Sequence, residues 1–210
     1  MFGIHDLTLF IISGLLLNLV PGPDSLLIMS RSASQGWRAG SAAALGIGTG
    51  TMLHVGAAAI GLSALLATSA AAFTLVKLLG AAYIFYLGLC LLLRKKMDRK
   101  MLADVPPVPY RNIVFQGFLT NVLNPKVALF FLAFVPQFIA AGAPNKALAF
   151  IILGCIFNLN SMLWCNFLAV SSAMASHRLK PNQAVSAWLN RIAGGLFIAL
   201  GLKLALSRQP

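Results

Sequence analysis

The stretch Asn18-Leu-Val-Pro-Gly-Pro-Asp24 interrupts an apolar run that covers residues 7–29. A run of this length can cross the core of a bilayer, about 30 Å thick, as a single helix. Pro-Gly-Pro removes two amide donors and places a flexible residue between two fixed ones, so a helix can hardly continue through it. Backbone groups that are freed in hydrocarbon are costly unless protein or water satisfies them. We therefore expect a broken membrane helix whose break lines a polar cavity.

The composition of the whole chain is that of an integral membrane protein. Of 210 residues, 59% are hydrophobic and 10% are charged, and the mean hydropathy is +0.86. A soluble domain has roughly 45–50% apolar and about 25% charged residues, so this chain has too few ionisable groups to cover a water-facing surface. The sequence predicts an all-α polytopic membrane protein with six transmembrane helices, at 7–29, 38–66, 70–93, 112–140, 147–174 and 188–207.

A proline-rich hydrophilic stretch at residues 94–111 divides the six runs into three and three. Because three is an odd number, two similar halves would lie inverted relative to each other in the bilayer. The fourth run repeats the break of the first, with Asn121-Val-Leu-Asn-Pro-Lys126. Inverted repeats with broken helices are typical of secondary transporters. We expect one transmembrane domain over residues 1–210, made of two inverted three-helix repeats at 1–93 and 112–210 with broken first and fourth helices.

Both breaks are expected near the middle of the bilayer. Pro21 lies 14 residues into its run and Pro125 lies 13 residues into its own, so each break is roughly 20 Å from the point where its helix begins. Asp24 and Lys126 follow directly, and charges at this depth usually mark an ion or substrate path. We therefore expect the substrate-binding or transport path to include Asn18, Pro21, Gly22, Pro23, Asp24, Asn121, Asn124, Pro125, Lys126 and His54.

Two of these residues have structural alternatives. Asp24 would bind the ammonium group of a substrate or carry a transported proton, or it would only cap a helix resuming at Ser25, as Ser or Asn could. Lys126 would belong to the path, or it would only pair with Asp24 or with free carbonyl groups. Substitution of Asp24 by Ala is expected to abolish transport.

Other polar residues lie within the second and fifth runs. Gly46, Gly50 and His54 share one helix face, which predicts close helix packing with His54 hydrogen-bonded across the contact, or a protonatable His54 in the path. In the fifth run, Asn158, Asn160 and Ser161 suit a cavity wall and interhelical hydrogen bonding equally well.

The net charge of +12 comes from sixteen Lys and Arg against four Asp and no Glu. These basic residues concentrate in alternate loops, and loops rich in Lys and Arg lie on the cytoplasmic side of a membrane. The pattern predicts that both termini lie outside and that the linker 94–111 lies in the cytoplasm. Nucleic-acid binding is not expected, because the chain has no soluble domain and no aromatic-basic module. The cytoplasmic set is Arg31, Arg38, Arg94, Lys95, Lys96, Arg99, Lys100, Arg111, Arg178, Lys180 and Arg191, against Lys146 and Arg208 outside.

The sequence offers little for enzymatic or metal chemistry. Three cysteines, Cys90, Cys155 and Cys165, lie inside apolar runs without a C-x-x-C pair, and the three histidines are far apart. We therefore expect no enzyme activity, no cofactor and no metal site. A divalent-metal exporter would need several oxygen ligands, usually carboxylates, and one intramembrane Asp is a poor start.

These motifs resemble the LysE/RhtB family of bacterial amino-acid exporters. The resemblance covers essentially the whole chain and rests on the two broken motifs, the glycine-rich span and several residues behind the second break. Those features are Asn18–Asp24, the short Arg31–Arg38 loop with Gly36, the span from Gly40 to Gly56, Gly117–Lys126, Phe130, Phe131 and Pro136-Gln-Phe138.

The resemblance implies export of amino acids or close derivatives across the bacterial inner membrane, driven by the proton gradient. The family that the chain resembles includes a branch for homoserine, threonine, homoserine lactones and leucine-type compounds. Another branch exports lysine and arginine. With a single intramembrane carboxylate and Lys126 nearby, we favour a neutral zwitterion as the substrate, with protons and membrane lipids as further partners. Export of basic amino acids or a divalent metal, and a non-transport membrane protein, stay open as alternatives, as does a homodimer packed through the Gly-lined faces.

Overall fold

The computed structural model describes residues 2–68, 106–140 and 142–178, together with scattered positions within 74–93 and 191–206. In these residues the chain is helical, with one isolated β-bridge and no strand, so the expected all-α class is confirmed. About half of the residues of the expected third and sixth spans, and residues 94–105 of the expected linker, lie outside the described part. The helices are α1 (Leu7–Leu19), α2 (Pro23–Gln35), α3 (Trp37–Thr68), α6 (Tyr110–Val122), α7 (Pro125–Leu129) and α8 (Lys146–Arg178).

The first and fourth spans are broken, as expected. α1 and α2 are bent by 55° at the first break, and α6 meets the segment Pro125–Phe138 at 48°. Each second half begins with a proline as its first residue, where the missing amide hydrogen is not needed. In the described residues, α3 and α8 are each long and apolar enough to cross a membrane alone, and each bent pair adds one more candidate span.

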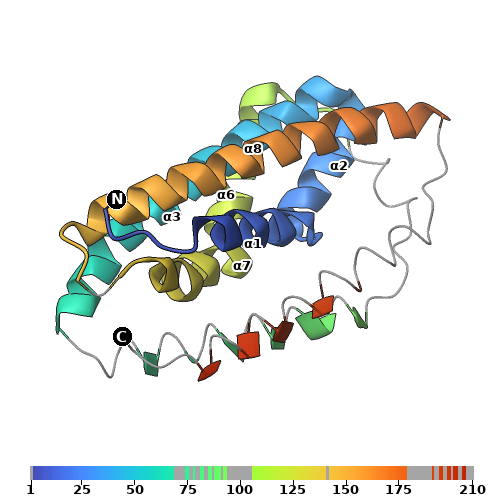
Figure 1. The fold of residues 1–210 in the computed structure, drawn as a ribbon. Helices are drawn as coiled ribbons and strands as arrows, with labels where there is room; N and C mark the ends of the chain where they lie inside the picture. The colour runs from blue at the N-terminus through green and yellow to red at the C-terminus, as the bar shows by residue number, and fades with distance from the viewer. Residues whose placement is uncertain are drawn as a thin grey trace.

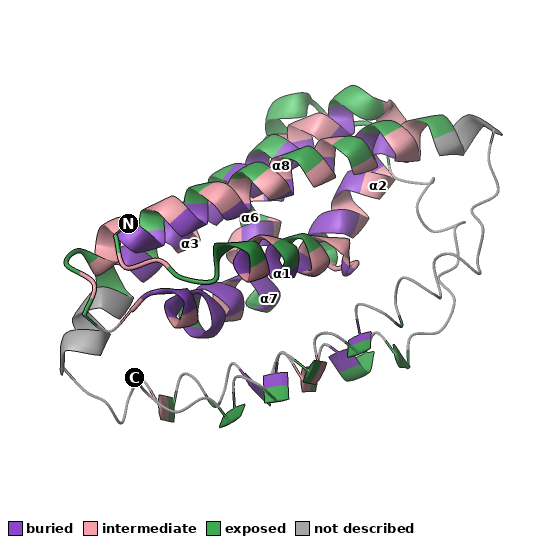
Figure 2. Cartoon of the chain, in the orientation of Figure 1, coloured by how far each residue is buried: buried purple, intermediate pink, exposed green. Residues whose placement is uncertain are grey.

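The two long helices, α3 and α8, pack against each other and against the broken helices. α8 runs along the whole described body, and α1 and α7 lie beneath it (Figure 1). Beyond α7 the chain continues through a π-helical turn (η1, Phe130–Phe134) and a 3-10 turn (η2, Val135–Phe138). This region is largely buried (Figure 2). It contributes to a core that is rich in phenylalanine, including Phe10, Phe130, Phe131, Phe150 and Phe157.

α3 packs directly on the backbone of α6 through glycines. A Cβ atom at Gly46 would collide with the carbonyl oxygen of Val114, and one at Gly117 would collide with the carbonyl oxygen of Ala43. Small residues at such positions let two membrane helices approach closely. The predicted glycine face of α3 therefore lies against α6 within the same chain.

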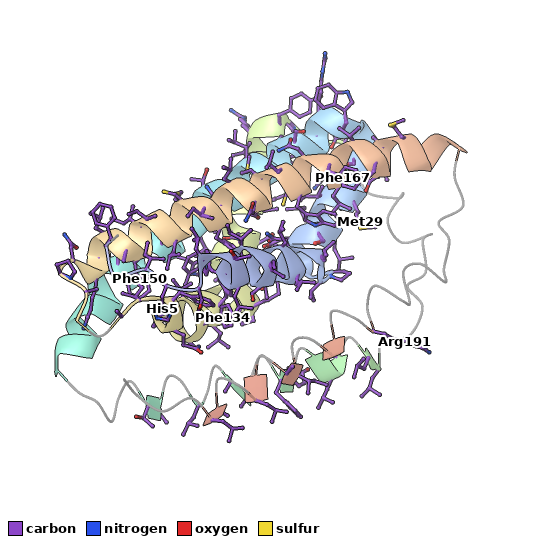
Figure 3. All side chains as sticks on the ribbon, in the orientation of Figure 1. His5, Met29, Phe134, Phe150, Phe167 and Arg191 are labelled. Atoms are coloured by element: carbon purple, nitrogen blue, oxygen red, sulfur yellow. The ribbon has the colours of Figure 1, made fainter. Side chains whose placement is uncertain are left out.

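At one end of the molecule, the residues before α1 pair with the residues after η2. His5 N donates to the Phe138 carbonyl at 3.0 Å, and Ala140 N donates to the Gly3 carbonyl at 2.8 Å. His5 lies at the same end as Phe134 and Phe150, while Met29 and Phe167 lie toward the opposite end (Figure 3). We call this pairing of residues 3–5 with 138–140 the N-terminal closure.

A second closure ties the end of α2 to the residues before α6. The buried Arg31 guanidinium donates to the Pro106 carbonyl at 3.0 Å and to Gln116 Oε1 at 2.8 Å. The Gln35 amide makes two bonds with the backbone of Val108, at 2.9 and 3.1 Å. Arg31, expected in a loop, is therefore a buried part of α2. We call this contact of Arg31 and Gln35 with residues 106–108 the linker closure.

The two closures are related along the chain. The separation in sequence between Asn18 and Asn121, the two asparagines before the breaks, also relates Gly3 to Pro106 and His5 to Val108. In each closure the segment before one broken span is bonded to the end of the other broken span.

We predict that Gly46→Ala destabilises the protein by about 1–3 kcal/mol, because the new methyl group forces α3 away from α6. Gly56→Ala, in the same helix, is the matched control, since a Cβ atom there has no neighbour within 4 Å. Unfolding in detergent micelles measures both variants. Equal stability of the two would contradict the close packing at Gly46.

Candidate functional site

The two breaks lie against each other, and the first is completed by a side chain from the second. In a continuous helix the Leu17 carbonyl would accept from the amide of residue 21, but that residue is Pro21, which has no amide hydrogen. Lys126 Nζ instead donates to the Leu17 carbonyl at 3.1 Å and to the Val20 carbonyl at 3.0 Å. Lys126 therefore pairs with free carbonyl groups, and its place in the transport path stays a prediction.

The second break also has a proline at this point. In a continuous helix the Asn121 carbonyl would accept from residue 125, but that residue is Pro125, and the carbonyl accepts instead from Asn124 N at 2.9 Å. His54 Nε2 lies 3.1 Å from this carbonyl oxygen, and because a carbonyl only accepts, Nε2 carries the hydrogen. The His54 ring stacks on Phe131, with centroids 6.3 Å apart, so His54 is held across the helix contact.

Asp24 lies between the breaks and is 8% exposed. Its Oδ2 accepts from Asn121 Nδ2 at 2.8 Å, and Asn121 Oδ1 accepts from Thr51 Oγ1 at 3.4 Å. A Cβ atom at Gly50 would be 2.9 Å from the Asn121 side chain, so glycine there leaves room for this amide. Asp24 Oδ1 has no hydrogen-bond partner in the described structure.

The helix-cap alternative for Asp24 is wrong. α2 begins at Pro23 and its N-cap residue is Gly22, with no side-chain capping bond. The carboxylate lies in the first turn, where the positive end of the helix favours it, but its one hydrogen bond crosses to the other half of the chain. At the second break, Asn124 Oδ1 does cap α7, accepting from Lys126 N at 3.0 Å.

Asp24 and Lys126 do not touch. In the described part of the chain, the only side-chain contact within 4.0 Å between an acidic and a basic group joins His5 and Asp6, far from the breaks. The carboxylate is bonded to an amide and the ammonium group to two carbonyls. A ligand can therefore reach the charge of Asp24 without first breaking an ion pair.

A small cavity lies where the breaks meet. Its volume is about 20 Å³, room for one water molecule and not for a larger solute. An amino acid therefore does not fit in the cavity as it stands. The lining is polar at Asn18, Asp24, Ser25, Thr51, Asn121, Lys126, Ser161, Trp164 and Cys165, and apolar at Leu17, Ile47, Val127 and Phe157.

The cavity gathers four of the residues expected in the path, Asn18, Asp24, Asn121 and Lys126. Five others, Pro21, Gly22, Pro23, Asn124 and Pro125, shape the breaks beside it. His54, Gly46 and Gly50 lie in the contact between α3 and α6 and are not in the cavity lining.

Sequence reasoning missed Thr51, Trp164 and Cys165 as cavity residues. Trp164 carried a readable signal, because it lies near the middle of a membrane helix, away from the interfaces where tryptophan collects. Ser161, from the polar cluster of the fifth run, lines the cavity, while Asn158 and Asn160 lie outside its lining. The residues described here contain no group of three or more His, Cys, Asp or Glu side chains that could hold a metal ion.

The sequence of the whole chain matches known proteins. The family model for LysE type translocators matches residues 15–208. The leucine efflux protein of Salmonella typhimurium is 28% identical over 204 residues, covering 97% of this chain and 96% of that protein. The uncharacterized membrane protein YrhP of Bacillus subtilis is 34% identical over 212 residues, covering 97% and 100%. No solved structure matches the chain.

The match over nearly all of its length shows that this chain belongs to the LysE family of translocators. The resemblance seen in the sequence is confirmed. The protein is accordingly a multi-pass membrane transporter and not an enzyme.

Lys126→Met is expected to lower the free energy of unfolding by about 2 kcal/mol or more, because two buried carbonyl groups lose their donor. Lys146→Met, at the partly exposed start of α8, is the control and should change stability little. Unfolding in detergent gives the comparison. An unchanged Lys126→Met protein would show that Lys126 does not complete the first break.

Proposed function

We propose that the protein exports a neutral amino acid or close derivative from the cytoplasm in exchange for protons. The observation that carries the proposal is Asp24, a buried carboxylate with one unpartnered oxygen, facing a cavity where two broken helices meet. A charge held in this way is costly without a ligand, and such residues mark transport paths. The leucine efflux relatives support an amino acid of the leucine, threonine or homoserine type.

The charges and the wall of the cavity favour a neutral substrate. One carboxylate and one ammonium group lie in its lining, so a zwitterion leaves the charge there balanced. A lysine or arginine side chain would bring a further positive charge next to Lys126, without a second carboxylate in the described lining to receive it. The apolar residues Leu17, Ile47 and Phe157 suit an aliphatic side chain. Export of basic amino acids or of a divalent metal is therefore less well supported.

Proton exchange follows from the same oxygen. A substrate ammonium group and a proton would both bind Asp24, and each neutralises the carboxylate. Binding of one therefore releases the other, which is the requirement for antiport. The Asn121 hydrogen bond keeps the carboxylate in place through both states.

We infer that the two closures are the gates of alternating access. The N-terminal closure would lie on the outside and the linker closure on the cytoplasmic side of a bacterial inner membrane, with both termini outside. Their relation along the chain supports two inverted repeats at 1–93 and 112–210, joined by the linker 94–111. Both closures are formed around a cavity too small for an amino acid, which fits an occluded state. Gly46 and Gly50 pack within one chain and give no support to a homodimer.

Transport by purified protein in proteoliposomes under an imposed pH gradient tests the function. The panel is labelled leucine, threonine, homoserine, lysine and cadmium. We expect one neutral amino acid to move in a gradient-dependent way, Asp24→Ala to reduce this movement at least 100-fold, and Asp24→Asn to lose its dependence on the gradient. Asp6→Asn, an exposed carboxylate, is the matched control and should transport normally.

Movement of lysine or cadmium alone would contradict the neutral substrate. No movement of any amino acid by folded, inserted protein would contradict export altogether. Gradient-driven transport by a well-expressed Asp24→Asn variant would remove the proton role from Asp24.

The gate assignment predicts that Gln35→Leu loosens the cytoplasmic side, because two hydrogen bonds to Val108 are lost. In a variant without the native cysteines, Ser25→Cys reports access to the cavity. A membrane-impermeant maleimide applied from the cytoplasmic side should react about 5-fold faster or more when Gln35→Leu is added. Gln137→Leu, whose amide bonds only within its own segment, is the control. An unchanged rate would contradict the gate.

A further inference from the structure

Two hydrogen-bond donors of cavity-lining residues have no acceptor in the described structure. Trp164 Nε1 on α8 and Asn18 Nδ2 on α1 are buried and have no partner in the described structure. Both residues line the cavity that Asp24 faces. Buried N–H groups are nearly always hydrogen-bonded in folded proteins, so an exception calls for a partner that is absent.

The unused groups form a set. Asp24 contributes a charged acceptor on α2, and Trp164 and Asn18 contribute neutral donors on two other helices. Lys126, the only cation among the described lining residues, already donates to the two backbone carbonyls left free at the end of α1. Among the buried side-chain atoms without a hydrogen-bond partner, the donors that belong to cavity-lining residues are Trp164 Nε1 and Asn18 Nδ2.

We propose that Trp164 Nε1 and Asn18 Nδ2 bind the carboxylate of the exported amino acid while Asp24 Oδ1 binds its ammonium group. This proposal rests on the proposed function and adds the carboxylate subsite to it. A carboxylate accepts two hydrogen bonds from neutral donors readily, and such charge-assisted bonds are strong. The site then selects a ligand with both an ammonium group and a carboxylate, and rejects amines, amides and esters that lack the second.

The size of the closed cavity agrees with this arrangement. About 20 Å³ holds one water molecule, which could bond to the donors between transport cycles. A substrate carboxylate would replace that water when a closure opens. A substrate carboxylate would also account for the position of Trp164, because an indole in the middle of a membrane helix needs a partner for its N–H group.

Trp164→Phe removes the N–H donor and keeps an aromatic ring. For the neutral amino acid that the wild type transports, we expect the KM to rise about 10-fold or more, the usual effect of losing a bond to a charged group. The inhibition constant of the corresponding amine, which has the same side chain and ammonium group but no carboxylate oxygen to accept from Trp164, should stay within about 2-fold. Trp37→Phe, an exposed tryptophan at the start of α3, is the matched control.

A second readout is independent of transport. Trp37→Phe with Trp188→Phe leaves Trp164 as the only tryptophan of the three in the chain. Its fluorescence in detergent should shift when the transported amino acid is added, and shift less with the corresponding amine.

The outcomes distinguish failure of the proposed function from failure of the carboxylate subsite. A wild-type protein that moves no amino acid contradicts the proposed function itself. If the wild type transports, two results for Trp164→Phe contradict only the carboxylate subsite: an unchanged KM, or an equal rise in the KM of the amino acid and the inhibition constant of the amine. Equal inhibition of the wild type by the amine and the amino acid contradicts that subsite too, as does a Trp164 fluorescence that the transported amino acid leaves unchanged.

Discussion

Prolines that remove amide donors in the middle of two membrane helices constrain the rest of this structure. Each leaves a carbonyl without its helical partner at a depth where water is scarce. The Leu17 carbonyl takes a hydrogen bond from Lys126, and the Asn121 carbonyl takes one from His54. Since Lys126 belongs to the second half of the chain and His54 to the first, each half bonds to a carbonyl at the break in the other. The first break depends on the second half for these donors, whereas the Asn121 carbonyl also accepts from Asn124 N within its own half.

These contacts between the halves create the site. Docking of the breaks brings the Asn121 amide to the Asp24 carboxylate and encloses a small polar cavity beside both. The Lys126 ammonium group donates to backbone carbonyls and not to Asp24. Asp24 Oδ1 therefore has no hydrogen-bond partner and is available to a ligand. Contacts between the halves extend to the ends of the broken spans, where the N-terminal closure and the linker closure join them by hydrogen bonds. Binding, proton exchange and gating would then use one set of contacts between the halves.

Much of this architecture is readable from the sequence, because it follows from local chemistry. The Pro-Gly-Pro and Asn-Pro-Lys motifs predict both breaks, and run lengths predict the helices around them. The contacts that each residue makes with other helices are harder to predict from the sequence. Lys126 next to a lone Asp24 suggests an ion pair, but a preference for free carbonyls depends on the angle between α1 and α7. Trp164 and Thr51 join the cavity only through the packing of α8 and α3, which residue spacing within one helix does not specify.

The central claim is that a neutral amino acid and a proton exchange at Asp24. The most direct measurement uses proteoliposomes with a trapped pH-sensitive dye, no initial pH difference and a clamped membrane potential, to which a concentration gradient of leucine or the transported neutral amino acid is applied. The account predicts that amino acid moving down its gradient drives protons the opposite way, and that Asp24→Asn abolishes the proton movement. Amino-acid flux without proton movement, or proton movement that survives in Asp24→Asn, would contradict it.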